Sequence, residues 1–309
     1  MRWFETPSFD FIRAQKIAYL FSGTMIVISL VAIFGLGLNY GIDFRGGKEF
    51  VFEFDRPVDV VELRSELTEP LGTGTAPEIK LFGSDSEILL RTDAEQEIDV
   101  VRETIMSTFS QLYPEATVTV QKTDLVGPRF AEDLRTGALY SIIFALAVVF
   151  IYIFIRFKGW YFSAGAIAAL AHDVLIVLGI FTVMAQFATF DVSIDQAIIA
   201  AFLTIVGYSL NDTVVVFDRI RENSIIYKTM AFKEMINKSL NDTLSRTVIT
   251  SVTTLFVVTV LFIFGGEVLK GFAFALVLGV ILGTYSSLFV ASSLVVELQK
   301  RAMEAKAKS

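Results

Sequence analysis

The stretch that decides the fold is IIAAFLTIVGYSLNDTVVVF, residues Ile198–Phe217, in which the acid Asp212 interrupts a long apolar run. A transmembrane helix needs about 20 predominantly apolar residues, and this stretch is long enough to be one. A charged side chain near the bilayer centre costs at least about 2.5–3.5 kcal/mol on insertion scales, so such residues usually face a protein interior or a water path. Asp212 is therefore the first candidate functional residue. The alternative is a protonated acid that hydrogen-bonds two helices together.

The whole chain has the composition of a membrane protein. Of its 309 residues 54% are hydrophobic, and the mean hydropathy is +0.62, whereas soluble globular chains are about 45–50% apolar. The sequence predicts an α-helical polytopic membrane protein with six transmembrane helices. Their apolar stretches are Ile17–Leu38, Leu139–Ile155, Tyr161–Ala185, Ile198–Phe217, Val248–Phe264 and Phe272–Val296.

Lysine and arginine are distributed unevenly between the connections. The N-terminus, the second and fourth connections and the C-terminal tail are basic, whereas Gln186–Gln196 has no basic residue and Gly265–Gly271 has only one. By the positive-inside rule, both termini are cytoplasmic. We expect residues 1–38 to hold an N-terminal segment and the first helix, residues 39–135 an extracytoplasmic domain, and residues 136–309 a five-helix membrane domain with a basic tail.

The hydrophilic block 39–135 alternates between strand-like and helix-like patterns. Phe50, Phe52 and Phe54 alternate along a first strand, and Ile98, Val101, Ile105, Phe109 and Leu112 recur at helical spacing. The order β-α-β-β-α-β predicts a small α+β domain of the ferredoxin-like type. Its many acids are interpreted as a solvated surface, with a partner-docking face as the alternative.

Several function classes lack their residues in this chain. It has no cysteine, no G-x-x-x-x-G-K-[ST] loop and no H-E-x-x-H or G-x-S-x-G motif, and its single histidine, His172, lies inside a span. We therefore expect neither an enzyme nor a metal or other cofactor. The net charge of −7 comes mostly from the hydrophilic block and argues against a nucleic-acid partner. An ion gradient is the expected energy source.

Three further polar residues accompany Asp212 and Asn211, either inside the apolar stretches or at their ends. Arg246 opens the fifth stretch and either points toward Asp212 or extends to the membrane interface, where Asp242 is an i,i+4 partner. His172 and Asp173 lie together in the third stretch and form either a proton relay or a structural pair.

The segment 218–246 combines basic residues with a loose apolar stripe, which predicts a cytoplasmic amphipathic helix at the membrane surface. It contains a second copy of the pentapeptide Ser-Leu-Asn-Asp-Thr, whose first copy, 209–213, includes Asp212. In this polar setting Asn241 or Asp242 is expected to cap a helix or to contact solvent. The surroundings, rather than the pentapeptide, thus carry the functional signal.

Five motifs in order resemble the SecF family over nearly the whole chain. They are Gly-Ile-Asp-Phe-Arg-Gly-Gly (41–47), Val-Gly-Pro (126–128), Ala-His-Asp-Val (171–174), Gly-Tyr-Ser-Leu-Asn-Asp-Thr-Val-Val-Val-Phe-Asp-Arg-Ile-Arg-Glu-Asn (207–223) and Leu-Ser-Arg-Thr (244–247). The family signature residues are Gly41, Asp43, Gly46 and Gly47. Ala131 departs from the pattern, because the family often has Gly there.

The resemblance implies a protein-export membrane subunit of the SecDF complex, with an RND-like fold, in the cytoplasmic (inner) membrane. It implies use of the proton motive force, or of a sodium gradient, to assist translocation by the Sec pathway. The implied partners are SecD, the SecYEG translocon with YajC- or YidC-type proteins, exported unfolded polypeptide and the lipid bilayer. The implied proton pathway includes Asp212 and Arg246, with Asn211, His172 and Asp173 as auxiliary polar residues. An RND-type exporter of lipids or hydrophobic small molecules and a non-motor scaffold are the alternatives.

Overall fold

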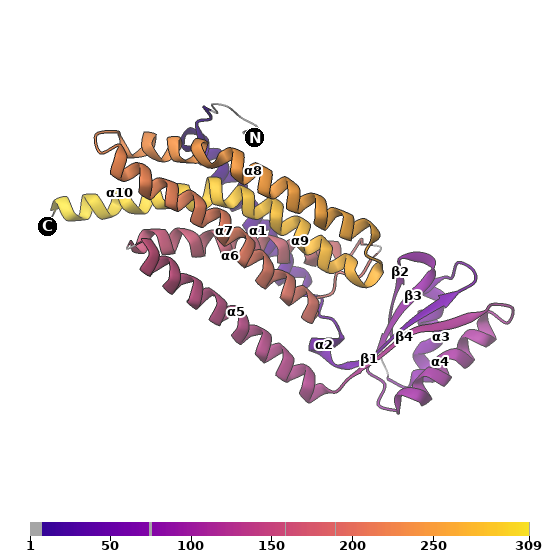
Figure 1. Cartoon of the computed structure of the whole chain (residues 1–309). Coiled ribbons are helices and arrows are strands. Elements are labelled where there is room, and N and C mark those ends of the chain that lie inside the picture. The colour runs from indigo at the N-terminus through magenta and orange to yellow at the C-terminus, as the bar shows by residue number, and fades with distance from the viewer. Residues whose placement is uncertain (1–7, 74–75, 158, 189, 309) are drawn as a thin grey trace.

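The computed structural model describes residues 8–308 except 74, 75, 158 and 189. Long helices form one part of the molecule, and a small sheet with two helices forms the other (Figure 1). We call residues 47–126, from the first to the last strand, the sheet domain. The C-terminal helix ends at the side of the helical part that is far from the sheet domain.

Six helices in the described residues are long and apolar enough to cross a membrane, as predicted. The last of them is a composite, in which a short π-helix (η1) separates two α-helices. The helices are α1 (Phe11–Leu36), α5 (Pro128–Phe157), α6 (Trp160–Met184), α7 (Gln196–Ile226), α8 (Phe232–Phe264), α9 (Glu267–Ser286), η1 (Ser287–Ala291) and α10 (Ser292–Lys308).

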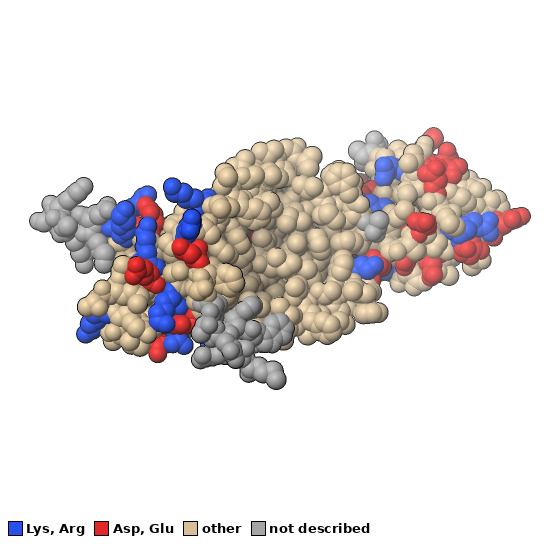
Figure 2. All heavy atoms as spheres, turned by 90° about the horizontal axis from the view of Figure 1, so that it is seen from above, with Lys and Arg blue, Asp and Glu red and all other residues tan. Residues whose placement is uncertain are grey.

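The charged residues gather at the two ends of the molecule. Figure 2 shows a broad belt without Lys, Arg, Asp or Glu between the sheet domain and the opposite end of the helices. Such a belt is what a bilayer requires, because its hydrocarbon core is about 30 Å thick and a charge inside it is costly. The belt and the helix lengths together support a multi-pass membrane protein.

The predicted amphipathic helix at the membrane surface is not formed. Residues 218–226 continue α7, and α8 begins at Phe232 and runs into its apolar part without a break. The part of the apolar stripe that lies in α8 packs against protein, because Ile236 and Leu240 are fully buried in a cluster with residues of α6 and α10. The segment is therefore the packed end of two membrane helices.

The second copy of the pentapeptide meets one of its two expected roles: neither Asn241 nor Asp242 caps a helix, but Asp242 is exposed to solvent. Both lie well inside α8. The Asn241 side chain hydrogen-bonds the backbone N–H and carbonyl of Phe9 at 2.9 and 2.8 Å. Asp242 pairs with Lys238 at 3.4 Å and accepts a hydrogen bond from Asn223. Asn241 thus attaches the N-terminal segment to α8, and Asp242 joins α8 to α7.

The sheet domain has the predicted order of strands and helices. The elements are β1 (Gly47–Phe54), α3 (Val60–Leu71), β2 (Glu78–Phe82), β3 (Ser84–Thr92), α4 (Ile98–Leu112) and β4 (Val118–Val126). The sheet is antiparallel with the order β2-β3-β1-β4, which is the split βαβ arrangement of ferredoxin-like domains. Phe50, Phe52 and Phe54 are buried, and the ring of Phe52 meets that of Phe109 on α4 at 5.0 Å. A four-residue helix, α2 (Ile42–Arg45), precedes β1 and was not predicted.

Close packing fixes α7 against α9. A Cβ atom on Gly279 would overlap the side chain of Ile205, and one on Gly283 would lie 2.9 Å from Cβ of Ser209. The two glycines, spaced by four, therefore let the backbones approach as small residues do between membrane helices. This contact determines how the polar residues of α7 meet their neighbours.

Candidate functional site

Asp212 lies on α7 at its contact with α8 and α9 and is 3% exposed. Its carboxylate accepts a single hydrogen bond in the described part of the chain, from Ser251 Oγ of α8 at 3.5 Å. Thr284 Oγ1 of α9 in turn lies 2.7 Å from Ser251 Oγ. A long, single hydrogen bond satisfies little of the capacity of a carboxylate, which has about four acceptor positions. Asp212 is thus buried but weakly held.

Arg246 lies on α8 close enough to interact electrostatically with Asp212. Among the residues that the structure describes, no salt bridge joins the two side chains, and Arg246 is exposed. Thr247, the next residue, is fully buried, and its hydroxyl has no hydrogen-bond partner within the described ranges. The sequence prediction that Arg246 and Asp212 lie near one another is consistent with this arrangement, while a proton-pathway role for them stays a prediction.

His172 and Asp173 form a second buried polar cluster, at 3% and 1% exposure. His172 Nδ1 lies 2.9 Å from Asp173 Oδ1. Ser209 of α7 and Ser286 of α9 each donate to Asp173 Oδ2 at 2.7 Å. Ser286 is the last residue of α9 before the π-helix η1, and π-bulges commonly occur at functional positions in helices. Asp173 is therefore bound from three sides.

The far side of the imidazole ring continues this cluster to α1. His172 Nε2 lies 3.0 Å from Ser22 Oγ, and Ser22 Oγ lies 3.0 Å from the hydroxyl of Tyr285. The Tyr285 hydroxyl donates to the carbonyl of Ala18 at 3.0 Å. Sequence reasoning selected His172 and Asp173 but missed Ser22, Tyr285 and Ser286, because nothing in the spacing of α1 and α9 marks them as partners.

Asn211, the remaining auxiliary residue, is separate from both clusters. It is exposed, whereas the next residue, Asp212, is buried. Successive helical residues point about 100° apart, so these two side chains leave α7 on different faces. The side chain of Asn211 therefore lies on a surface of α7 that this chain does not cover.

A buried ion-pair cluster joins the sheet domain to the α6–α7 connection. Arg91 of β3 donates from Nε to Glu49 of β1 and from Nη2 to Asp191, both at 2.7 Å, and from Nη2 to Ser193 at 3.0 Å. The Arg91 side chain is only 9% exposed. We call Glu49, Arg91, Asp191 and Ser193 the junction. Glu49 is an exception to the predicted solvated surface of acids, because it is buried in a contact between parts far apart in sequence, whereas most acids of the sheet domain are exposed.

The charges of the junction stabilise one another. Burial by itself would lower the pKa of Arg91, but Asp191 and Glu49 outweigh it and raise that pKa above its ordinary value. Burial would raise the pKa of Asp191, but Arg91 and the hydrogen bonds from Ser193 hold it below its ordinary value. Both groups are therefore charged at neutral pH, and the guanidinium is held in a fixed orientation.

Asp195 lies just after the junction and differs from it electrostatically. Its side chain caps α7 by accepting the N–H of Ile198 at 2.8 Å. Burial raises its pKa to about 6; the Ile198 hydrogen bond opposes this, and the negative charges of Asp191 and Asp43 add to it. Asp195 is thus the acid of this region that changes charge closest to neutral pH.

The glycine signature residues carry the chain from α1 into the sheet domain. Gly46 and Gly47 have φ angles of +77° and +107°, which favour glycine. A Cβ on Gly47 would also lie 3.0 Å from the carbonyl oxygen of Thr92. A side chain at this position would therefore conflict both with the backbone conformation and with β3.

Gly41 and Asp43 attach the same segment to the start of α7. The N–H of Gly41 donates to the carbonyl of Ile194 at 2.8 Å. Asp43 Oδ2 accepts the N–H of Gln196, the first residue of α7, at 2.9 Å. An acid at a helix N-terminus satisfies an otherwise free N–H and is favoured by the helix dipole. The signature thus couples β1, through α2, to α7.

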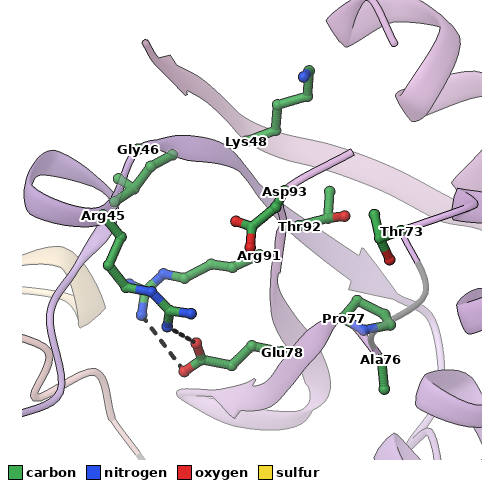
Figure 3. Close-up of a pocket in the computed structure, with 11 residues that line it drawn as sticks. Arg45, Gly46, Lys48, Thr73, Ala76, Pro77, Glu78, Arg91, Thr92 and Asp93 are labelled. Atoms are coloured by element: carbon green, nitrogen blue, oxygen red, sulfur yellow. Dashed lines mark hydrogen bonds and ion pairs between the residues drawn. The ribbon is translucent and has the colours of Figure 1, made fainter. Parts of the chain in front are cut away.

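A cavity of about 250 Å³ lies beside the junction (Figure 3). Arg45 pairs with Glu78 at 3.1 Å, and Lys48 Nζ donates to the carbonyl of Ala94 at 2.6 Å. Arg91 lies 3.8 Å from Glu78. The cations that line this cavity are engaged with acceptors of the protein itself, so we interpret the cavity as part of the joint rather than as a ligand site. No group of three or more potential metal ligands occurs in the described residues.

The fold and these clusters define a class: a multi-pass membrane protein with a ferredoxin-like domain between its first two membrane helices. The family profile described as protein export membrane protein SecD/SecF, C-terminal, matches residues 105–301, and the SecD/SecF GG motif matches residues 31–58. The chain belongs to the SecD/SecF family.

Curated relatives named protein translocase subunit SecF align over nearly the full chain. The protein of Rhodothermus marinus is 55% identical over 98% of this chain and 97% of its own length. That of Desulfurispirillum indicum is 41% identical over 98% of this chain and 95% of its own length. The crystal structure of SecDF, a translocon-associated membrane protein, from Thermus thermophilus matches with a TM-score of 0.86 at 35% identity. That match covers 96% of this chain but only 40% of the SecDF chain, so the remainder of SecDF has no counterpart here.

Proposed function

We propose that this chain is the SecF-type subunit of a SecDF complex and assists protein translocation across the cytoplasmic membrane, driven by a proton or sodium gradient. The observation that carries the proposal is Asp212, a carboxylate 3% exposed among membrane helices and held by one 3.5 Å hydrogen bond. Full-length similarity to translocase subunits named SecF and the fold shared with SecDF support the role in translocation and the partnership with SecD. SecYEG and exported polypeptide are proposed further partners.

Such a site must gain and lose a proton with only a small difference in free energy between its charged and neutral forms. A buried carboxylate is stabilised as a neutral acid by the low dielectric and as an anion by a nearby cation. Asp212 has both influences, because it is buried and Arg246 acts on it from α8 without a direct ion pair. Gain or loss of a proton then changes the interaction of α7 with α8, where Ser251 is the hydrogen-bond partner.

The helix α7 offers a direct mechanical connection from this site to the sheet domain. Its first residue, Gln196, is bound by Asp43, and the junction lies immediately before it. Asp212 lies 16 residues further along the same unbroken helix, about 24 Å away at 1.5 Å per residue. A shift of α7 at Asp212 therefore reaches the sheet domain through a rigid element. Coupling requires only that protonation has different free energies in two positions of that domain.

The proposed orientation places the sheet domain on the outer side of the membrane and both termini in the cytoplasm. Exposed basic residues lie where α7 and α8 meet, including Arg221, Lys228 and Lys233. This connection is at the end of the helices far from the sheet domain (Figure 1). The positive-inside rule assigns that end to the cytoplasm. The sheet domain is then available to polypeptide that emerges from a translocon, and the subunit acts as a motor component without enzymatic chemistry.

The test is the isosteric change Asp212→Asn, which keeps the shape but removes the exchangeable charge. We expect proton-dependent export into inverted vesicles, and proton-dependent conductance of the reconstituted complex, to fall by a factor of ten or more, about 1.4 kcal/mol or greater in coupling free energy. Asp242→Asn is the matched control, because it occurs in the same pentapeptide but belongs to the α7–α8 hairpin.

Two results would contradict the proposal. Undiminished export and conductance in Asp212→Asn would remove Asp212 from ion coupling. Loss of assembly with unchanged proton dependence in the remaining complex would favour the structural scaffold instead.

A further inference from the structure

The hydrogen bonds around His172 determine how many protons its ring carries. The network here is closed, because each hydroxyl has one proton and a backbone carbonyl can only accept. The assignment therefore starts from the carbonyl at its end, that of Ala18 on α1.

The Tyr285 hydroxyl uses its single proton to donate to the Ala18 carbonyl, 3.0 Å away. Its oxygen must then accept in the 3.0 Å contact with Ser22, so Ser22 donates its own proton to Tyr285. The Ser22 oxygen has no proton left for the imidazole, and its 3.0 Å contact with His172 Nε2 requires a proton on that nitrogen. Nε2 is therefore an N–H donor.

The other ring nitrogen is a donor as well. Nδ1 lies 2.9 Å from Asp173 Oδ1, so one proton lies between the two atoms. An aspartic acid is ordinarily a stronger acid than an imidazolium, and Ser209 and Ser286 stabilise the carboxylate by donating to its second oxygen at 2.7 Å, which favours an ionised Asp173. The other acceptor within reach of Ser286, the carbonyl of Gly283, is further away at 3.3 Å. An ionised carboxylate is acceptor-only, so Nδ1 carries the proton between it and the ring.

We propose that His172 is a doubly protonated imidazolium, paired with the carboxylate of Asp173, and that this ion pair fixes the positions of four membrane helices. Asp173 and His172 are on α6, Ser22 is on α1, Ser209 on α7 and Ser286 on α9. The titratable groups that contact the ring are Asp173 from α6 and Tyr285 from α9; α1 and α7 present only hydroxyls to the pair.

The pair has no net charge, which lowers the free-energy cost of burying it. A buried charge is retained when it is paired and its remaining hydrogen-bonding groups are satisfied. All the polar atoms of the His172 and Asp173 side chains have partners at 2.7–3.0 Å. The pair therefore holds the helices in position and does not transfer protons. It binds Ser209, which lies three residues before Asp212 on α7. This inference concerns the charge state of His172 and stands independently of whether Asp212 carries protons.

The chain suits a direct measurement, because His172 is its only histidine. The full chain is labelled with ¹⁵N-histidine, with its membrane partner if the two copurify, and placed in lipid vesicles. Solid-state NMR at neutral pH then distinguishes an imidazolium, with two protonated nitrogens, from a neutral ring with one unprotonated nitrogen. A spectrum of the His172→Gln variant identifies any signal from partner histidines.

We expect two protonated nitrogens in the wild-type chain, and one unprotonated nitrogen in Asp173→Asn, where the imidazolium has no counter-charge. Tyr285→Phe is the milder variant if Asp173→Asn does not fold: Ser22 loses its acceptor, its proton turns to Nε2, and the doubly protonated signal decreases. Tyr208→Phe is the matched control and leaves the signal unchanged, because the buried Tyr208 hydroxyl has no hydrogen-bond partner in the described residues. A neutral ring in the wild type overturns the proposal, as does an imidazolium that persists in both variants.

Discussion

Asp212 and Asp173 are both buried carboxylates among the same membrane helices, yet their surroundings are opposite. Asp173 contacts three donors at 2.7–2.9 Å, one of them an imidazole. Among the described residues, Asp212 has one hydroxyl at 3.5 Å and the charge of Arg246, which acts on it without a direct ion pair. Strong, complete hydrogen bonding holds a group in one charge state, whereas weak bonding leaves both states accessible. Burial alone therefore does not identify a site that exchanges ions; the number and length of its bonds do.

The strongest test of this difference is to neutralise each acid in turn with the same isosteric change. Asp173→Asn leaves the buried imidazole without its counter-charge, and breaking a buried pair from one side costs about 3–5 kcal/mol. Asp212→Asn removes a charge with a single long hydrogen bond, and we expect a change in stability within about 1 kcal/mol. Thermal unfolding of both variants in the same lipid or detergent measures the difference. Equal destabilisation by the two changes would remove the distinction.

The junction extends the comparison to an ion-pair cluster outside the membrane helices. Arg91→Ala leaves Asp191 without its cation and leaves the buried Glu49 paired only with Lys122, and we expect a loss of about 2–4 kcal/mol in the attachment of the sheet domain. Amide hydrogen exchange in Asp191–Ile194 reports it, because the N–H of Ser193 donates to Asp191 and that of Ile194 to Asn39. Arg102→Ala is the control, since Arg102 forms only an exposed i,i+3 pair with Asp99. Unchanged exchange in Arg91→Ala would show that the junction is not what holds the two parts together.

The smallest expected effect concerns Asp195, whose pKa is raised to about 6 mainly by burial. Since its folded pKa lies above the ordinary value of 3.8, its contribution to stability is complete below about pH 3.8 and decreases as the pH rises to about 6. Asp195→Asn keeps an N-cap residue and removes this cost, so we expect it to stabilise the chain by roughly 1 kcal/mol at pH 7.5, after allowance for solvent screening, and by about half as much at pH 5.

The measurement is thermal unfolding of the wild type and of Asp195→Asn at both pH values. Asp191 does not disturb it, because its pKa is held below its ordinary value and its charge is constant between pH 5 and 7.5. A variant that is less stable than the wild type at pH 7.5 would contradict the burial cost assigned to Asp195.

The amino-acid sequence by itself determined the six membrane helices, the βαββαβ order of the sheet domain and the selection of Asp212, His172 and Asp173. These features follow from local properties: hydropathy over a span, the periods of helices and strands, and the cost of charge in an apolar run. The same local logic misjudged segment 218–246, because an apolar stripe does not reveal whether lipid or another helix will cover it.

Which of these residues contact one another depends on the tertiary structure. The junction joins Glu49, Arg91 and Asp191, and the His172 cluster joins residues of α1, α6, α7 and α9. Partners so far apart in sequence leave no periodic signal, and a serine or tyrosine in an apolar helix looks the same whether it packs or hydrogen-bonds. The sequence therefore shows where burial of a charge is unfavourable, and the packing shows which hydrogen bonds offset that burial. They are short and complete at Asp173, whereas Asp212 has one long hydrogen bond.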